Sequence, residues 1–102
     1  MAVGMVAPFA PSGNGVGVAM PASTASVSAT LPASGESVLF FNSTASIAFV
    51  RTDAGPATPA DTPIPAGGRL LMEAGPYVSA VSCVLASGSG TVYASPGAGS
   101  TY

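Results

Sequence analysis

The feature that most constrains this sequence is a series of short apolar stretches with a period of two. Between residues 23 and 31, apolar residues alternate with Ser and Thr, the pattern of a strand with one buried face. Residues 37–42 are apolar on both faces and predict a central strand, and residues 46–52 predict another strand after a tight connection. No window of eleven or more residues combines helical periodicity with helix caps. The chain is therefore predicted to be all-β.

The second half of the sequence continues the same pattern. Residues 53–68 hold four prolines and predict a long surface loop, of which residues 62–65 are expected to lie extended along the sheet edge. The remaining predicted strands are 69–73, 77–85 and 91–95. Six to eight short strands separated by regular turn signals are typical of a small antiparallel β-sandwich or barrel, jelly-roll-like in its build.

Turns and core follow from the same strands. Residues 32–36 and 74–76 are rich in Pro and Gly and are predicted turns, and residues 87–90 predict a hairpin turn. The large buried side chains of the domain are expected to be Phe40, Ile47 and Phe49.

Three parts of the chain are distinguished by composition. Residues 1–22 are predicted to form an extended N-terminal arm, residues 23–96 the β-sandwich domain, and residues 97–102 a flexible tail. The arm has too many apolar residues for a solvated linker, so either it lies in a groove on a neighbour or it is a frayed end.

Charge is almost absent from this chain. It has two Arg, no Lys, four acidic residues and no His among 102 residues, so 6% is charged, against about 25% in ordinary soluble domains. Charged side chains keep monomers apart and oppose the joining of sheet edges. Their scarcity predicts a protein that packs against partners, and the alternative is a surface domain solvated by Ser, Thr and Gly.

The charge balance also excludes several partners and locations. A net charge of −2 without a basic stripe argues against nucleic acid and against anionic membranes. The prolines of residues 1–35 make a membrane-spanning helix implausible, and the N-terminus lacks the basic region of a signal peptide. One cysteine excludes an internal disulfide, which leaves oligomerisation as the stabiliser of a short chain.

No arrangement of residues predicts catalysis. There is no His to act as a base at neutral pH, and Cys83 lies within a predicted strand, where an inert buried thiol is expected. The four acidic residues are spread over separate turns and a strand end, so a catalytic pair is not indicated. These acidic residues are Glu36, Asp53, Asp61 and Glu73. The protein is predicted to be no enzyme and to need no cofactor or metal.

Two further hypotheses concern the long loop and the two arginines. Asp53 and Asp61 are candidate Ca²⁺ ligands, with solvated loop acids as the alternative. Each arginine stands near an acid in the sequence and is expected to form a salt bridge between strands or between subunits, of which we favour the interface. The residues predicted to contact other subunits are Phe9, Val16, Val18 and Met20 in the arm, and Arg51 and Arg69 on the body.

A resemblance to a known group covers residues 37–99. The segments VLFFN, SIAFVR, TPIPAGG, RLLME, YVSAVS and SGTVYASPGAG follow one another in this order. This succession resembles small β-sandwich proteins of tailed bacteriophages, the head decoration (cement) proteins and related minor capsid proteins. The resemblance implies that the protein binds the major capsid protein on the outside of the virion, as a homotrimer, and stabilises the head. It carries over no catalytic residue.

Two rival functions remain at this point. One is another virion part of the same build, such as the base of a head fibre or a tail component. The other is a glycan-binding module, for which the only candidate aromatic contacts, in the absence of Trp, would be Tyr77, Tyr93 and Tyr102.

Overall fold

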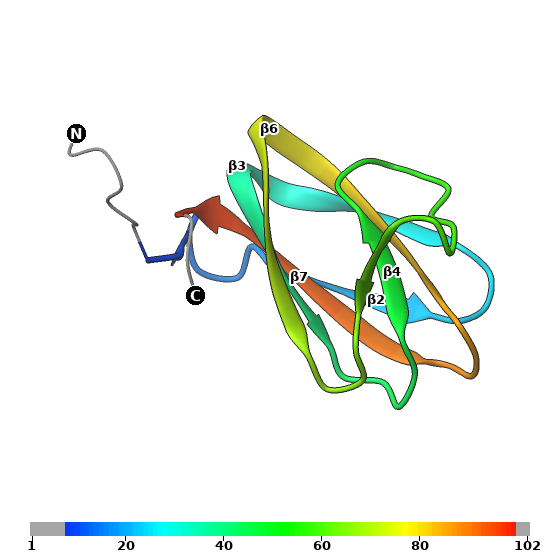
Figure 1. Ribbon diagram of the computed structural model, residues 1–102. Helices are drawn as coiled ribbons and strands as arrows, with labels where there is room; N and C mark the ends of the chain where they lie inside the picture. Colours follow the sequence, from blue (N-terminus) through cyan, green and yellow to red (C-terminus); the bar gives the residue numbers. More distant parts are fainter. Residues whose placement is uncertain (1–7, 100–102) are drawn as a thin grey trace.

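The computed structural model describes residues 8–99, apart from the side chains of residues 74–77. These residues contain no helix and form one curled antiparallel sheet of seven strands, which makes a half-barrel (Figure 1). The strands are β1 (Ala10–Pro11), β2 (Val18–Ala22), β3 (Val27–Asn42), β4 (Ala48–Arg51), β5 (Thr62–Ile64), β6 (Arg69–Leu85) and β7 (Gly90–Ala98). The prediction of a small all-β sandwich or barrel is confirmed.

The order of the strands explains the shape. The sheet runs β1-β7-β3-β6-β4-β5, and β2 pairs with β7 on the same edge as β1. β3 and β6 lie side by side along nearly their whole length, and Figure 1 shows both bending together at one end of the molecule. Because the two long strands bend, the sheet curls and encloses a core on its inner face.

The two long strands differ from the prediction. Residues 32–36 and 74–76 are not turns between strands but lie inside β3 and β6. The register of the β3–β6 ladder shifts on both sides of Gly35, which indicates a β-bulge at this position. A bulge bends a strand without ending it. The Pro- and Gly-rich residues therefore mark a bend within each strand, and the prediction that the chain reverses there is wrong.

The core agrees with the prediction in part. Phe40 is fully buried, but Ile47 is 45% exposed and Phe49 is half-buried. β4 begins one residue after Ile47, and its alternation directs Ala48 and Val50 inward instead. The other large buried side chains of the core include Met20, Leu31, Val38, Ile64, Val81, Leu85 and Val92.

The predicted N-terminal arm contributes two strands, β1 and β2, to the sheet. β2 pairs with β7 over five residues, and its inward side chains include Met20, which is 1% exposed, and Ala22. The alternation of inward and outward positions over β2 is that of an ordinary half-buried strand. Residues 1–7 of the predicted arm lie outside the described residues. At the other end β7 continues to Ala98, so the predicted tail begins within a strand, and residues 100–102 also lie outside the described part.

Proline occurs in each of the three strands at the margins of the sheet. β1 contains Pro11, β2 contains Pro21 and β5 contains Pro63. Proline has no backbone N–H to donate, so it is suited to an edge strand and hinders the addition of a further strand. The predicted extension of residues 62–65 along the sheet edge is confirmed, because β5 is the last strand in the sheet order.

A buried amide fixes the corner after β3. The side chain of Asn42 is fully buried, and its Nδ2 donates hydrogen bonds to the backbone oxygens of Ser46 (2.7 Å), Ile64 (3.0 Å) and Pro65 (3.2 Å). Its Oδ1 accepts from the backbone N–H of Thr44 (3.0 Å) and from the Thr44 hydroxyl (2.6 Å). We call this network the Asn42 corner. It ties the predicted tight connection after β3 to the loop that follows β5.

Candidate interaction surface

The outward side of the sheet carries an exposed pair of aromatic rings. Phe41 on β3 is 40% exposed and Tyr93 on β7 is 45% exposed. The two residues are direct cross-strand partners, and their ring centroids are 6.3 Å apart with an angle of 23° between the planes. Stacked pairs at this spacing are a favourable arrangement of aromatic side chains.

The pair belongs to a row that crosses four strands. The ladder places Ala19 of β2 opposite Tyr93, Tyr93 opposite Phe41, and Phe41 opposite Arg69 of β6. All four are exposed. A second row, one pleat further along, contains Leu39 and Leu71, both half-buried. We call these residues the outer aromatic face: Ala19, Leu39, Phe41, Arg69, Leu71 and Tyr93.

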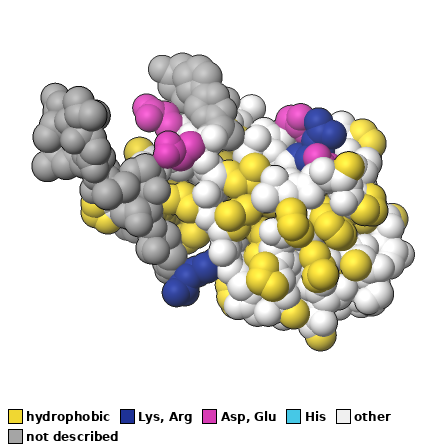
Figure 2. All heavy atoms as spheres, in the orientation of Figure 1, with side chains coloured by type: hydrophobic (Ala, Val, Ile, Leu, Met, Phe, Trp, Pro, Cys, Tyr) yellow, Lys and Arg dark blue, Asp and Glu magenta, His cyan; other side chains and the backbone are white. Residues whose placement is uncertain are grey.

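Charge is sparse on the surface as well as in the sequence. Figure 2 shows one face of the molecule on which hydrophobic side chains are spread among uncharged surface, and the few charged groups lie toward the margin. On the outer aromatic face, Arg69 is the one charged member. An apolar centre with a polar or charged rim is the usual arrangement of a protein interaction surface.

The second arginine has a partner within its own chain. Arg51 at the end of β4 donates from Nε and from a terminal nitrogen (Nη2) to the two carboxylate oxygens of Asp53, at 2.9 and 2.8 Å, and Asp61 lies 3.9 Å away. The hydrogen bond that Arg51 donates to Asp53 raises the pKa of Arg51 and lowers the pKa of Asp53. We call these three residues the Arg51 cluster.

The Arg51 cluster holds the long loop in place. Asp53 Oδ1 also accepts from the backbone N–H of Gly55 at 2.8 Å, and Asp61 Oδ2 accepts from the backbone N–H of Thr58 at 2.7 Å. The candidate Ca²⁺ site is thus two carboxylates that face a guanidinium and loop N–H groups. No group of three or more His, Cys, Asp or Glu suited to a metal occurs among residues 8–99. This donor set does not fit Ca²⁺, which needs several oxygen ligands together.

The residues predicted as contacts occupy separate places. Phe9 is half-buried against the end of β7, Val16 is half-buried in the loop before β2, and Val18 packs against the core. Met20 is buried within the core of its own chain, which removes it as a contact residue for another subunit. Of the two arginines, Arg69 alone belongs to the outer aromatic face. Arg51 pairs with acids of the loop that follows its own strand, rather than across two strands or with another subunit as predicted.

The aromatic pair itself was not predicted as a site. The sequence contained one signal for it: Phe40 and Phe41 are consecutive residues of a strand, and consecutive residues point to opposite faces. With Phe40 in the core, Phe41 has to face outward. The pairing with Tyr93 depends on the register between β3 and β7, which lie far apart in the sequence.

The single thiol lies away from these surfaces. Cys83 is fully buried in β6, and burial raises its pKa to about 11. The thiol is therefore protonated at neutral pH, as expected for an inert core cysteine rather than a nucleophile.

Comparisons with known proteins give no relative. No protein-family model matches the chain, and no curated protein or solved structure is significantly similar to it. Within residues 8–99 there is also no helix with the length and hydropathy needed to cross a membrane.

Proposed function

We propose that this protein is a structural part of a virus particle, a head decoration protein that binds the major capsid protein on the outside of the capsid and stabilises it. In this proposal the protein has no enzymatic activity and acts as a homotrimer. The succession of segments from residue 37 to residue 99 that resembles phage decoration proteins supports the proposal, as does the scarcity of charge.

The observation that carries the proposal is the outer aromatic face. Phe41 and Tyr93 are large, exposed and stacked on a rigid sheet, so they lose little conformational freedom when a partner covers them. Aromatic residues near the middle of an interface, with Arg at its side, are the usual sources of binding energy. Many copies on a closed lattice add their contacts, so weak individual interfaces suffice.

The proposal is tested by binding to heads of the encoding phage that were assembled without this protein. Replacing Tyr93 by Ser removes a central aromatic contact, which costs about 2 kcal/mol of binding and therefore about 30-fold in affinity. Occupancy is measured by cosedimentation over a range of protein concentrations, and head stability by heating the particles. Sedimentation velocity of the isolated protein gives the number of copies that associate.

A matched control is available in the same chain. Ile47 is 45% exposed, as Tyr93 is, but it precedes β4 and does not belong to the outer aromatic face. Ile47→Ser should bind heads as the unmodified protein does. Equal binding by both variants, or no binding by the unmodified protein, would reject the proposal.

The exposed aromatic pair also favours one alternative, a glycan-binding module. Sugar rings stack on exposed aromatic side chains of a sheet, and Thr91 and Ser95 lie on the same strand as Tyr93, with Ser43 directly after β3. Saturable binding on a glycan array that Phe41→Ala and Tyr93→Ala both abolish would favour this function. A third candidate, a head-fibre base or tail component, is distinguished by labelling the protein in micrographs of whole particles.

A further inference from the structure

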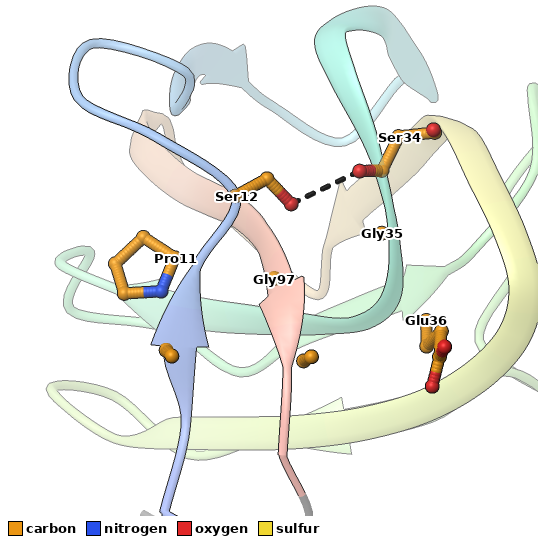
Figure 3. Close-up of a pocket in the computed structure, with 8 residues that line it drawn as sticks. Pro11, Ser12, Ser34, Gly35, Glu36 and Gly97 are labelled. Atoms are coloured by element: carbon orange, nitrogen blue, oxygen red, sulfur yellow. Dashed lines mark hydrogen bonds between the residues drawn. The ribbon is translucent and has the colours of Figure 1, made fainter.

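The short strand β1 lies beside the end of β7. Two residue pairs form the β1–β7 ladder. Beyond it, Ser12 donates from its backbone N–H to the oxygen of Pro96 (3.0 Å) and from its hydroxyl to the oxygen of Ser34 (2.9 Å). Figure 3 shows β1 beside the end of β7, with the bend of β3 across from them. We call residues 8–11 the docking strand.

The groove under the docking strand is formed by glycines. A Cβ atom on Gly97 would lie 2.7 Å from two carbon atoms of the Phe9 ring, and one on Gly99 would lie 2.7 Å from Phe9 Cα. A Cβ atom on Gly35 would lie 2.5 Å from the backbone nitrogen of Gly97. A side chain at Gly97 or Gly99 would collide with the docking strand, and one at Gly35 would collide with β7. The docking strand fits into the groove because these positions have no side chains.

The groove continues into a cavity next to the docking strand. Its volume is about 330 Å³, and it lies between β1, the end of β7 and the bend of β3 (Figure 3). Small side chains and backbone line it, with Glu36 as the one charged lining residue. The cavity beside the docking strand is therefore lined by small groups and carries little charge, whereas the glycines under the strand contact it closely.

The segment that connects the docking strand to β2 contains slack. Val18 lies eight positions after Ala10, but their partners on β7, Ala94 and Ala98, are only four positions apart. Four extra residues therefore bulge out between β1 and β2. This segment, residues 12–17, includes three glycines, one of which, Gly15, has a φ of 68°. β2 is fixed by the buried Met20, so the docking strand has room to leave its groove while β2 stays in the sheet.

We propose that the docking strand is exchanged between copies, so that residues 8–11 of one copy occupy the glycine groove of a second copy. The occupant follows from the structure, because the groove already holds this segment within one chain. The same contacts form in both arrangements, so the balance between them depends on the connecting segment and on the local concentration of copies. The inference goes beyond the proposed function and does not depend on it.

Cysteine pairing between separate chains tests the exchange. Ala10 and Ala98 are exposed partners in the antiparallel ladder, at a separation that a disulfide can bridge. Ala10→Cys and Ala98→Cys are made in separate chains, one of which carries a mass tag, then mixed at high concentration and oxidised. Exchange predicts a mixed disulfide dimer, seen by mass spectrometry, at about tenfold the level of random collision.

A matched pair gives the level of random collision. Ala86 is exposed beyond the end of β6, away from the groove, so Ala10→Cys mixed with Ala86→Cys reports collision alone. Cys83 is buried in every variant and contributes equally. If the Ala10–Ala98 dimer is no more abundant than the Ala10–Ala86 dimer, the exchange is rejected.

A deletion distinguishes exchange from loose association. Removing residues 13–16 takes out the four extra residues, so β1 and β2 become one continuous strand along β7 in the registers already present. The shortened chain keeps its docking strand in place, and the mixed dimer should fall to the level of random collision. A mixed dimer that persists unchanged in the shortened chains would overturn the proposal. These tests use the purified protein without capsids, so their failure is separate from failure of the proposed function.

Discussion

The Asn42 corner and the Arg51 cluster each hold a loop against the sheet, but water reaches only one of them. The Asn42 side chain is fully buried and neutral. In the Arg51 cluster the side chains of Arg51 and Asp53 are 36% and 58% exposed. A buried polar group without partners loses its hydration and gains nothing in return, whereas exposed ions remain hydrated when their pair is broken.

The difference shows how a chain with few charges secures its loops. Five hydrogen bonds to one amide connect the turn after β3 with the loop after β5, without any ionised group. The Arg51 cluster uses three of the six charged side chains of the protein on one exposed loop. Most of the stabilisation is therefore expected from the neutral corner.

The largest effect is expected from Asn42→Ala. The change removes all five hydrogen bonds of the Asn42 side chain. The Pro65 oxygen keeps the N–H of Gly68 and the Thr44 hydroxyl keeps Ser46, but the Ile64 oxygen and the Thr44 N–H lose the buried amide as their partner, so the free energy of unfolding should fall by about 3 kcal/mol. Denaturant unfolding followed by circular dichroism measures the change. The control is Ser43→Ala, which removes one exposed hydrogen bond to Thr91 and should cost under about 1 kcal/mol. Equal losses in both variants would remove the distinction between buried and exposed networks.

A smaller loss of stability is expected from Thr44→Val, in which the new side chain has the same shape as that of Thr44 in the Asn42 corner. The Thr44 hydroxyl donates to Asn42 Oδ1 and accepts from the backbone N–H of Ser46 (3.2 Å), and the residue is 7% exposed. Loss of the Thr44 hydroxyl should lower the free energy of unfolding by about 1–2 kcal/mol, since the Asn42 side chain keeps its other partners. As a control, Thr30→Val at an exposed position should change the free energy of unfolding by no more than about 0.5 kcal/mol. A loss at Thr44 as large as that of Asn42→Ala would show that the corner fails as one unit.

The contrast between the two networks also separates what the sequence predicts from what it does not. The pairing of Arg51 with a nearby acid was predictable because Asp53 is two residues away. Asn42 was predicted only as part of a tight connection. Its partners Ile64 and Pro65 lie more than twenty residues further along the chain, and only the curled sheet brings them to the amide.

The fold shows the same division between local and distant causes. Alternation predicted the strands of the body and the all-β class, because the inward positions are set by the strand period alone. The continuity of β3 and β6 through Pro- and Gly-rich segments was not predicted, since a bend shared by two paired strands has the local composition of a turn.

The N-terminal segment was missed because its residues are small. Met20 and Ala22 face inward while Ala19 and Pro21 face outward, which is a strand period with little contrast in hydropathy. The outer aromatic face was missed for a different reason. Its centre is a contact between Phe41 and Tyr93, and such a contact follows from the register of two strands rather than from either segment.

The smallest effect is expected from Asp53→Asn, and it should depend on pH. The hydrogen bond from Arg51 holds the pKa of Asp53 in the folded protein below its ordinary value of 3.8. The carboxylate therefore stabilises the fold above the pKa of the unfolded chain, and this contribution is lost as the pH falls through the lowered pKa of the folded state. The unmodified protein should be slightly more stable than the variant at neutral pH, and the difference should disappear well below pH 3.8.

Two comparisons make this last measurement decisive. High salt should shrink the difference at neutral pH, because the pair is exposed and screened. The loss caused by Asn42→Ala should not follow the titration of Asp53, since a neutral amide does not ionise. Asn at position 53 still accepts the hydrogen bond from the N–H of Gly55, so the variant removes the charge and keeps the turn. A deficit of Asp53→Asn that stays constant down to about pH 2, below the range of ordinary carboxyl groups, would mean that the loop depends on the shape of this turn and not on the ion pair.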